Sequence, residues 1–594
     1  MKRSEIGEEY KWDLGKLFSG KLEWEKSFAL TSNRIGELKK YKGKLANPDF
    51  ALALFELSDE IGKEAEKLYV YAVMLMHTDG ADGEAVALSS RAGTLTAEFG
   101  AALAFVEPEL TALSDAELDA MADDPRFADY EYTIKRIKKN KAHVLSEKEE
   151  ALLARLREVT GAFGDIFEKI DSVDLPHPII RAGGEKIPLT HGTYSRLLQN
   201  PDRNVRKKAF AAYYALYEER LNTIAACYAA NVRKNNIISS LRGYSSAMQA
   251  SMESDDVPAG VYDKLINAVD NALPSLHEYV DYRRLVLGEL HMYDMYVPIV
   301  DGADIGTDYE SAFKTVLTAL SPLGGEYIGR LEKMKAERRI DVFENDGKRG
   351  GAYSWGAYRN PYVLLNYSGT PHDIFTIAHE LGHAMHSTYS DEALCYNKAG
   401  YSIFVAEVAS TTNEVLLLKY LLRSTNDVRV KKYLLSYYLD MFRTTLFRQT
   451  MFAEFELAVH KADAKGEPPT VDSLNKLYLK LNKKYYGKGV THDKQIRFEW
   501  ARIPHFYNAF YVYKYATGLT AAVTLANAIL SGEAGAKERY FNKFLRAGGS
   551  KSPYEILRDA GVDLMTDRPY EIAMLEFRNT LGEFTSLVTP ASRT

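Results

Sequence analysis

The segment "DIFTIAHELGHAMHS", residues 373–387, places three histidines and one glutamate within eight consecutive positions. His379 and His383 are four residues apart, and on a helix this spacing puts both imidazoles on one face within reach of a single metal ion. Glu380 lies about 100° further round the helix, near the metal without replacing a histidine. This is the H-E-x-x-H arrangement, in which two histidines bind zinc and the glutamate acts as general base. The segment therefore predicts a metal site with hydrolytic chemistry.

A catalytic zinc ion usually takes three protein ligands and keeps one position for water, so a third ligand is expected. His386 shares a face with His379 but lies roughly 10 Å further along the helix axis. We therefore interpret His386 as a residue that packs or supports a ligand rather than as a ligand. The metzincin pattern needs glycine at position 386 and histidine at position 389, and this chain has His386 and Tyr389. That class is excluded.

A second helical segment, "SIFVAEVASTTNEVLLLKYLL" at residues 402–422, offers carboxylates. Glu407 and Glu414 are seven residues apart and share one face of this helix. A carboxylate in an apolar stretch is costly to bury unless it is paired or binds a metal. Glu407 as a ligand, with Glu414 orienting a ligand histidine, satisfies that requirement. Two exposed glutamates on a half-buried helix remain the alternative.

The helix that carries the histidines has clear start signals. Thr370 suits the N-cap, Pro371 the first helical position, and Asp373 follows the cap by three residues. The helix is expected to run from about residue 371 to 387.

Most of the remaining chain also has helical periodicity, for example at residues 49–73, 203–240, 262–287 and 436–461. Residues 172–188 break the pattern and predict a small hairpin or a domain junction. In residues 348–367, Gly350 and Gly351 open a loop that leads to "YVLLNY", a short apolar run that predicts a strand. We expect an N-terminal helical domain at residues 1–190 and a catalytic domain at residues 191–594.

Composition restricts the classes of partner. The 594 residues carry a net charge of -6, which argues against a nucleic-acid binder that relies on a basic surface. The two cysteines are far apart in sequence, which suits a reducing cytoplasm rather than a disulfide framework. No apolar stretch follows the charged N-terminus, and none approaches the ~18 apolar residues of a membrane helix. We expect a cytoplasmic protein with neither nucleic acid nor membrane as partner.

Several segments together resemble the M3 family of zinc metallopeptidases, most closely its oligoendopeptidase F branch. They are "HELGHAMHS" followed by "FVAEVASTTNE", "GGAYSWG" with "PYVLLNY", "IPHFYNAFYVYKYATG", "FLRAGGSKSPYEILRDAGVDL" and the N-terminal "KWDLGKLF". The similarity covers nearly the whole chain. In that family a second helix brings a glutamate ligand some two dozen residues after the second histidine, and here 407 − 383 = 24. The resemblance therefore implies Glu407 as the third ligand.

The resemblance also implies a mainly α-helical fold. Two helical lobes would enclose a deep channel for short flexible peptides, with a small sheet beside the zinc helix. "YVLLNY" would then be an edge strand to which a peptide adds as another strand. Gly351 and Tyr362 are the substrate contacts expected there.

The implied mechanism uses one zinc ion per chain, held by His379, His383 and Glu407, to activate water and polarise the scissile carbonyl. Glu380 would take the proton from the water and pass it to the leaving amine. In the family, a histidine and tyrosines of a C-terminal segment stabilise the oxyanion. Here His505 matches, and Tyr513 is the first choice among the tyrosines, followed by Tyr515, which is also expected to contact substrate.

The sequence thus predicts a zinc-dependent endopeptidase that hydrolyses internal bonds of short oligopeptides. One alternative is an exopeptidase of the same fold, in which Arg359, Arg497 or Arg502 binds the terminal carboxylate of the substrate. Another is a non-catalytic peptide-binding protein, against which the intact Glu380 argues.

Overall fold

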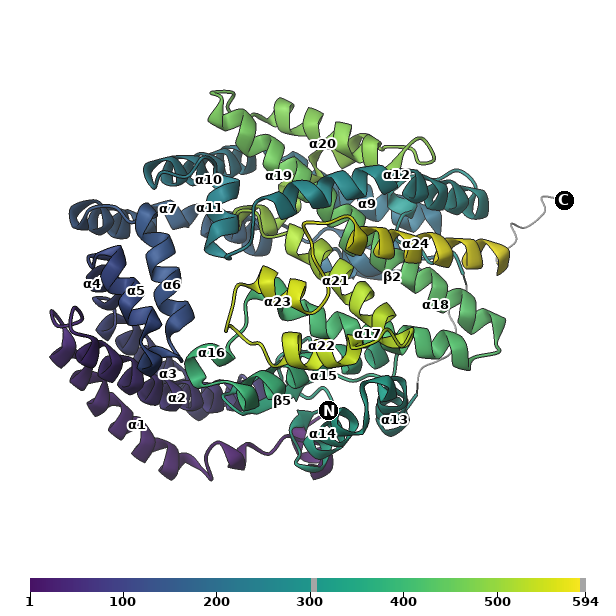
Figure 1. The fold of residues 1–594 in the computed structure, drawn as a ribbon. Coiled ribbons are helices and arrows are strands. Elements are labelled where there is room, and N and C mark those ends of the chain that lie inside the picture. Colours follow the sequence, from purple (N-terminus) through teal and green to yellow (C-terminus); the bar gives the residue numbers. More distant parts are fainter. Residues whose placement is uncertain (301–306, 588–594) are drawn as a thin grey trace. The chain divides into compact units, whose positions relative to one another are not determined.

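The computed structural model describes residues 1–300 and 307–587, and it is predominantly helical with two small sheets (Figure 1). The expected mainly α fold is confirmed. The chain forms two compact units, each built from three segments. The first unit comprises Met1–Glu147, Ile305–Tyr420 and Leu525–Val562, and the second comprises Lys148–Asp304, Leu421–Thr524 and Asp563–Thr594. The sequence boundary near residue 190 and the channel between two lobes stay predictions.

The first unit has a helical N-terminal part whose core continues into the sheet. Trp24 is fully buried there, and its indole N–H donates a hydrogen bond to the carbonyl of Leu68 at 3.0 Å. The same core includes Leu364 of the sheet. The helices are α1 (Lys21–Ile35), α2 (Pro48–Thr78), α3 (Gly83–Ala102), α4 (Val106–Thr111), α5 (Asp115–Asp123), α6 (Glu131–Asn140), α13 (Tyr309–Ala319), α14 (Gly325–Ala336), α15 (Pro371–Ala393), α16 (Tyr396–Ala399), α17 (Ile403–Ser424), α22 (Ala536–Arg539) and α23 (Pro553–Asp559).

The sheet of the first unit has the strand order β3-β5-β4, with β3 at Ile340–Asp341, β4 at Tyr353–Ala357 and β5 at Asn360–Leu364. β5 pairs in parallel with β3 and antiparallel with β4, so it is the central strand. The expectation that "YVLLNY" forms an edge strand is therefore wrong. Its continuous apolar run is typical of a strand covered on both faces. The terminal strand on the other side of β5 is β4.

The second unit is helical apart from one hairpin. β1 (Ile179–Ala182) pairs antiparallel with β2 (Glu185–Pro188), and Gly183 and Gly184 have positive φ in the two-residue turn. Of the two alternatives for residues 172–188, a hairpin or a domain junction, the hairpin is confirmed. The helices are α7 (Glu147–Lys169), α8 (His191–Leu198), α9 (Arg203–Glu218), α10 (Leu221–Leu241), α11 (Ala247–Ser254), α12 (Gly260–Leu287), α18 (Val428–Met441), α19 (Arg448–Ala464), α20 (Val471–Tyr486), α21 (Tyr513–Leu530) and α24 (Arg568–Leu587).

Two of the periodic sequence runs are interrupted in the structure. Residues 203–240 form two helices, α9 and α10, rather than one. The run at residues 436–461 passes from α18 through a π-helical turn, Phe442–Phe447, into α19. Within the described ranges, no helix combines the length and apolar character that a bilayer span requires.

Candidate metal centre and active site

The start of α15 agrees with the sequence signals. The carboxylate of Asp373 accepts hydrogen bonds from the backbone N–H of Thr370 at 2.8 Å and from the hydroxyl of Ser368 at 2.8 Å. Pro371 is the first helical residue, as expected. The helix continues to Ala393, beyond the expected end at residue 387. These hydrogen bonds cap the N-terminus of α15 and so define where the helix that carries the histidines begins.

Close packing sets α17 against α15. A Cβ atom added to Gly382 would lie only 2.6 Å from the Cα atom of Ser410, so glycine is required for this approach of the two backbones. Beside it, the side-chain amide of Asn413 donates a hydrogen bond to the carbonyl of Ala378 at 3.1 Å. These contacts determine which residue of α17 faces the histidines.

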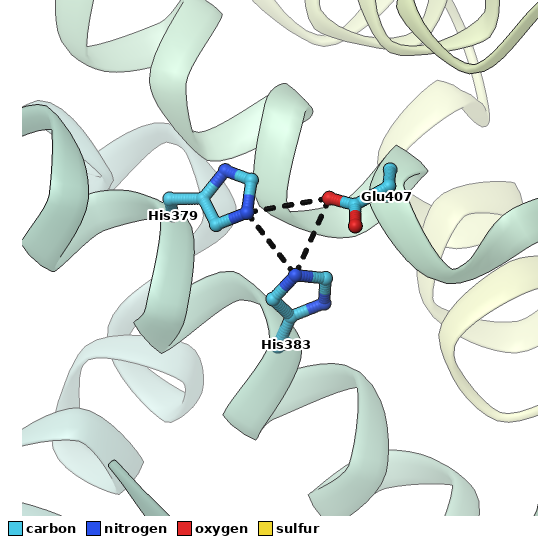
Figure 2. A group of neighbouring side chains, drawn as sticks. All are labelled: His379, His383 and Glu407. Atoms are coloured by element: carbon cyan, nitrogen blue, oxygen red, sulfur yellow. Dashed lines mark hydrogen bonds and ion pairs between the residues drawn. The ribbon is translucent and has the colours of Figure 1, made fainter. Parts of the chain in front are cut away.

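Three side chains converge where the two helices meet (Figure 2). The Nε2 atoms of His379 and His383 lie 3.2 Å apart, and Oε2 of Glu407 lies 3.2 Å from the first and 3.4 Å from the second. Tetrahedral zinc with bonds of about 2.0–2.1 Å places its donor atoms roughly 3.3 Å from one another. Two imidazoles and one carboxylate at these distances fit a metal ion.

The histidines and the glutamate of this group shift one another's pKa values. Burial lowers the pKa of His379, but hydrogen bonds with Glu407 and Glu414 outweigh it and raise that pKa well above 6.5. Burial would raise the pKa of Glu407, yet the two histidines lower it far below its ordinary value. The carboxylate of Glu407 therefore stays charged and attracts a positive ion.

Glu414 contacts the opposite side of the His379 ring. Its Oε1 atom lies 2.6 Å from Nδ1 of His379. A carboxylate at this distance accepts a hydrogen bond from Nδ1–H, which favours the tautomer whose Nε2 can bind a metal ion. The geometry is what an orienting role for Glu414 requires.

Glu380 is buried beside the three converging side chains. Burial raises its pKa, and the two histidines of the motif lower it in part. The backbone N–H of Ser354 in β4 also lowers the pKa of this carboxyl group. Ser354 carries no chemical signal in the sequence, because its contribution comes from the main chain.

A cavity of about 340 Å³ adjoins Glu380 within the first unit. Its walls include Gly351 and Ala352, from the loop before β4, and Asn366 after β5. Gly351 has φ of +83°, a conformation that favours glycine. The structure thus brings Gly351 near Glu380.

Tyr362 does not face this cavity. Its side chain is fully buried in β5, and its hydroxyl donates to the carbonyl of Asp13 at 2.9 Å. The expectation that Tyr362 contacts substrate is corrected, because the central position of β5 directs this ring into the core.

His386 packs away from the metal group. Its ring stacks on Tyr401 with centroids 3.8 Å apart and lies 4.8 Å from the ring of Phe544. Complete burial lowers the pKa of His386 to about 3, so the ring is neutral. The interpretation of His386 as a packing residue agrees with this position.

The predicted histidine and tyrosines of the second unit form a cluster of their own. The Nε2 atom of His505 lies 3.2 Å from the hydroxyl of Tyr515, and the ring of Tyr511 lies within 6 Å of both, at 5.9 and 5.5 Å between centroids. All three side chains are half-buried. They can present donors to a bound molecule.

Tyr513 does not belong to this cluster. Its side chain is fully buried, and its ring lies 5.2 Å from that of Tyr262. The first choice of Tyr513 as oxyanion donor is therefore wrong. Tyr511 lies before α21, which begins at Tyr513, so helical spacing could not identify which tyrosines meet His505.

The H-E-x-x-H helix, with a carboxylate supplied by the next long helix and a buried glutamate beside them, defines a metal-dependent peptidase. Comparison with known proteins gives the same class. The profile of Peptidase family M3 matches residues 196–576, and that of Oligopeptidase F matches residues 109–176. The chain belongs to peptidase family M3.

Similar proteins are bacterial. Oligopeptidase PepF of Bacillus subtilis is 40% identical over 592 residues, covering 99% of this chain and 88% of that protein. Group B oligopeptidase PepB of Streptococcus agalactiae is 39% identical, covering 99% and 98%. The crystal structure of oligoendopeptidase-F from Enterococcus faecium has a TM-score of 0.74 and 36% identity, covering 95% of this chain and 99% of that one.

Proposed function

We propose that this chain is a zinc-dependent endopeptidase that hydrolyses internal peptide bonds of short oligopeptides. The convergence of His379, His383 and Glu407 at 3.2–3.4 Å carries the proposal. Two imidazoles and one carboxylate in near-tetrahedral arrangement favour zinc, one ion per chain. Names such as oligopeptidase and oligoendopeptidase among the relatives support short peptides as substrates.

His379, His383 and Glu407 would hold the zinc ion, which would supply Lewis acidity for activating water and polarising the scissile carbonyl. Glu380 accepts a proton from the attacking water at its carboxylate and donates that proton to the leaving amide nitrogen. Glu414 keeps the Nδ1 proton of His379 and so orients the ring.

The substrate backbone is proposed to pair with β4, the terminal strand, rather than with β5. Gly351 lies in the loop before β4 and lines the cavity beside Glu380, which suits a contact with the peptide main chain. His505 and Tyr515 are proposed to donate hydrogen bonds to the oxyanion of the tetrahedral intermediate.

Of the three arginines considered for an exopeptidase, Arg359 and Arg502 are engaged elsewhere, whereas Nε of Arg497 is buried with no hydrogen-bond partner among the described residues. Nε of Arg359 donates to the backbone carbonyl of Asp391, and its backbone N–H donates to that carboxylate. Arg502 donates to Glu499 at 2.7 Å. These contacts favour cleavage inside the peptide over recognition of its end.

The cellular location is proposed to be the cytoplasm. Cys227 and Cys395 are both free thiols, as expected where the compartment is reducing.

The test is mass spectrometry of a peptide blocked at both ends after digestion by the wild type, by Glu380→Gln and by Glu392→Gln. Glu392 lies on the same helix and pairs with Arg330, so it serves as the matched control. We expect internal cuts by the wild type and the control, and none by Glu380→Gln or after chelation. An intact blocked peptide alongside trimming of unblocked ones would establish an exopeptidase instead.

A further inference from the structure

A carboxylic acid that the proposed mechanism does not use lies in the core of the second unit. Glu456 of α19 is fully buried. Burial raises its pKa to about 8, so the group is neutral at pH 7. An apolar side chain of similar size would avoid the cost of desolvating a carboxyl group. The hydrogen bonds of Glu456 must therefore offset the cost of burying its carboxyl group.

Among the described residues, the carboxyl group of Glu456 has one hydrogen-bond partner, a backbone N–H. The N–H of Phe510 donates a hydrogen bond to Oε1 at 2.8 Å. The second oxygen, Oε2, is buried and has no hydrogen-bond partner among the residues that the structure describes. The neutral acid can carry its proton on Oε2 while Oε1 accepts from Phe510.

Phe510 has an unusual backbone conformation. Its φ is +54°, in the left-handed region that bulky residues rarely adopt. Its ring is buried and lies 4.7 Å from His460 and 5.7 Å from Tyr262. Such a conformation persists only where the surroundings hold it. Glu456 accepts the hydrogen bond from the backbone N–H of Phe510 and so helps to hold this conformation.

The strained residue lies between the members of the half-buried cluster. His505 precedes it in the short helical turn Pro504–Tyr507, and Tyr515 follows it in α21. The reversal of the chain at Phe510 allows these two side chains to meet at 3.2 Å. The preceding carbonyl, that of Ala509, is held by the hydroxyl of Ser251 at 3.0 Å.

We propose that Glu456 is a positioning residue that holds Phe510 in its left-handed conformation and so places Tyr511 and Tyr515 beside His505. This inference rests on the proposed function, in which His505 and Tyr515 donate to the oxyanion. Glu456 does not touch the substrate, and its effect passes through the backbone of Phe510.

Two substitutions separate the hydrogen bond from the packing. Glu456→Gln keeps an acceptor oxygen at the same length, and Glu456→Met removes it while preserving an unbranched side chain. Thr450→Val is the matched control, because Thr450 is buried on the same helix and its hydroxyl bonds only to the carbonyl of Leu446 in the preceding turn. Hydrogen exchange by mass spectrometry over residues 505–515 measures whether the loop is held.

We expect faster exchange of residues 505–515 in Glu456→Met, and wild-type exchange in Glu456→Gln and Thr450→Val. For a quenched-fluorescence peptide, kcat of Glu456→Met should fall by about tenfold to a hundredfold, since small displacements of catalytic donors have such effects. KM should change by less than about twofold, because the donors act in the transition state. Glu456→Gln should restore most of kcat.

Tyr515→Phe, made in both backgrounds, separates this inference from the proposed function. If Tyr515→Phe lowers kcat strongly in the wild type but adds little to the loss already present in Glu456→Met, Glu456 acts by positioning Tyr515. Wild-type exchange and kcat in Glu456→Met overturn the inference. If Glu456→Met exchanges faster but keeps the wild-type kcat, and Tyr515→Phe has no effect on kcat, then Glu456 does hold the loop. In that case Tyr515 does not stabilise the oxyanion. If Glu456→Met does not fold, Glu456→Asp withdraws the acceptor by one methylene group and is measured in the same way.

Discussion

His379 has a carboxylate on each of its ring nitrogens, Glu407 at Nε2 and Glu414 at Nδ1. Only Glu407 is placed to share an ion with His383. Glu414 acts on the ring from behind, fixing both its tautomer and its direction. The chemistry of one residue thus depends on two glutamates with different tasks.

Replacement of Glu414 by alanine should weaken zinc binding about 10–100-fold, because His379 loses the acceptor that orients it. Competition with a chromogenic chelator measures the affinity. Glu392→Ala, on the exposed end of α15, is the control and should bind zinc as the wild type does. Equal affinities for both variants would show that Glu414 does not orient the ligand.

The same substitution at two neighbouring tyrosines tests the assignment of the oxyanion donor. Tyr515→Phe should lower kcat by about 10²–10³-fold, as loss of an oxyanion donor does elsewhere. Tyr513→Phe should leave kcat nearly unchanged, because this ring is buried in the core. Steady-state kinetics of both variants, with zinc content measured in parallel, decide between them. A larger loss in Tyr513→Phe would reinstate the first assignment.

Among the elements, the crossing of α15 and α17 determines whether the ligands meet. Gly382→Ala should destabilise the protein by about 1–3 kcal/mol, since the added methyl group collides with the backbone at Ser410. Zinc content should fall as well, because Glu407 moves with α17. Gly161→Ala on α7 is the control: its position has open space, so a helix-favouring methyl group should not destabilise. Thermal unfolding and metal analysis measure both effects, and a fully loaded, stable Gly382→Ala would contradict the prediction.

The turn between β4 and β5 is held by a carboxyl group of α2. The carboxyl group of Glu66 accepts a hydrogen bond from the backbone N–H of Tyr358 at 3.1 Å. Burial raises the pKa of Glu66 from 4.5 to about 7. The folded state binds the proton of the Glu66 carboxyl group more tightly than the unfolded state does. The contribution of this proton to the free energy of unfolding is therefore complete below pH 4.5 and is lost as the pH rises through 7. Glu66→Gln keeps an acceptor and carries no charge.

At pH 5 the unfolding free energy of Glu66→Gln should be close to that of the wild type, and at pH 8.5 it should exceed the wild type by about 1–3 kcal/mol. Urea denaturation at the two pH values, followed by far-ultraviolet circular dichroism, gives the difference. A gain that is equal at both pH values would mean that the charge on Glu66 is not responsible.

At the scale of the whole molecule, each of the two units has its own core, and the metal group lies entirely in the first. Zinc at 100 times its dissociation constant should stabilise the state that binds it by about 2.7 kcal/mol. Removal by a chelator should therefore speed hydrogen exchange in α15 and α17 while α19 and α20 of the second unit exchange as before. Equal acceleration in both units would show that metal binding is coupled to the entire chain.

Sequence alone was sufficient for features set by short-range geometry. The capping signals at Thr370 and Pro371 located the start of α15, and the spacing of His379 and His383 follows from the pitch of a helix. Glu407 was a candidate because it lies on the next helical segment, and the family resemblance implied it as the third ligand. Periodicity also indicated the mainly α fold.

Tertiary structure alone decided features that depend on distant parts of the chain. β5 became a central strand because Ile340 pairs with Val363, and no local pattern in "YVLLNY" reveals that partner. After the positive φ of Phe510, Tyr515 contacts His505 and Tyr513 lies in the core, although the four tyrosines of the segment look alike in sequence. Helical spacing is a local property of the backbone, whereas strand order and the direction of a side chain after a turn follow from contacts between residues far apart in the chain.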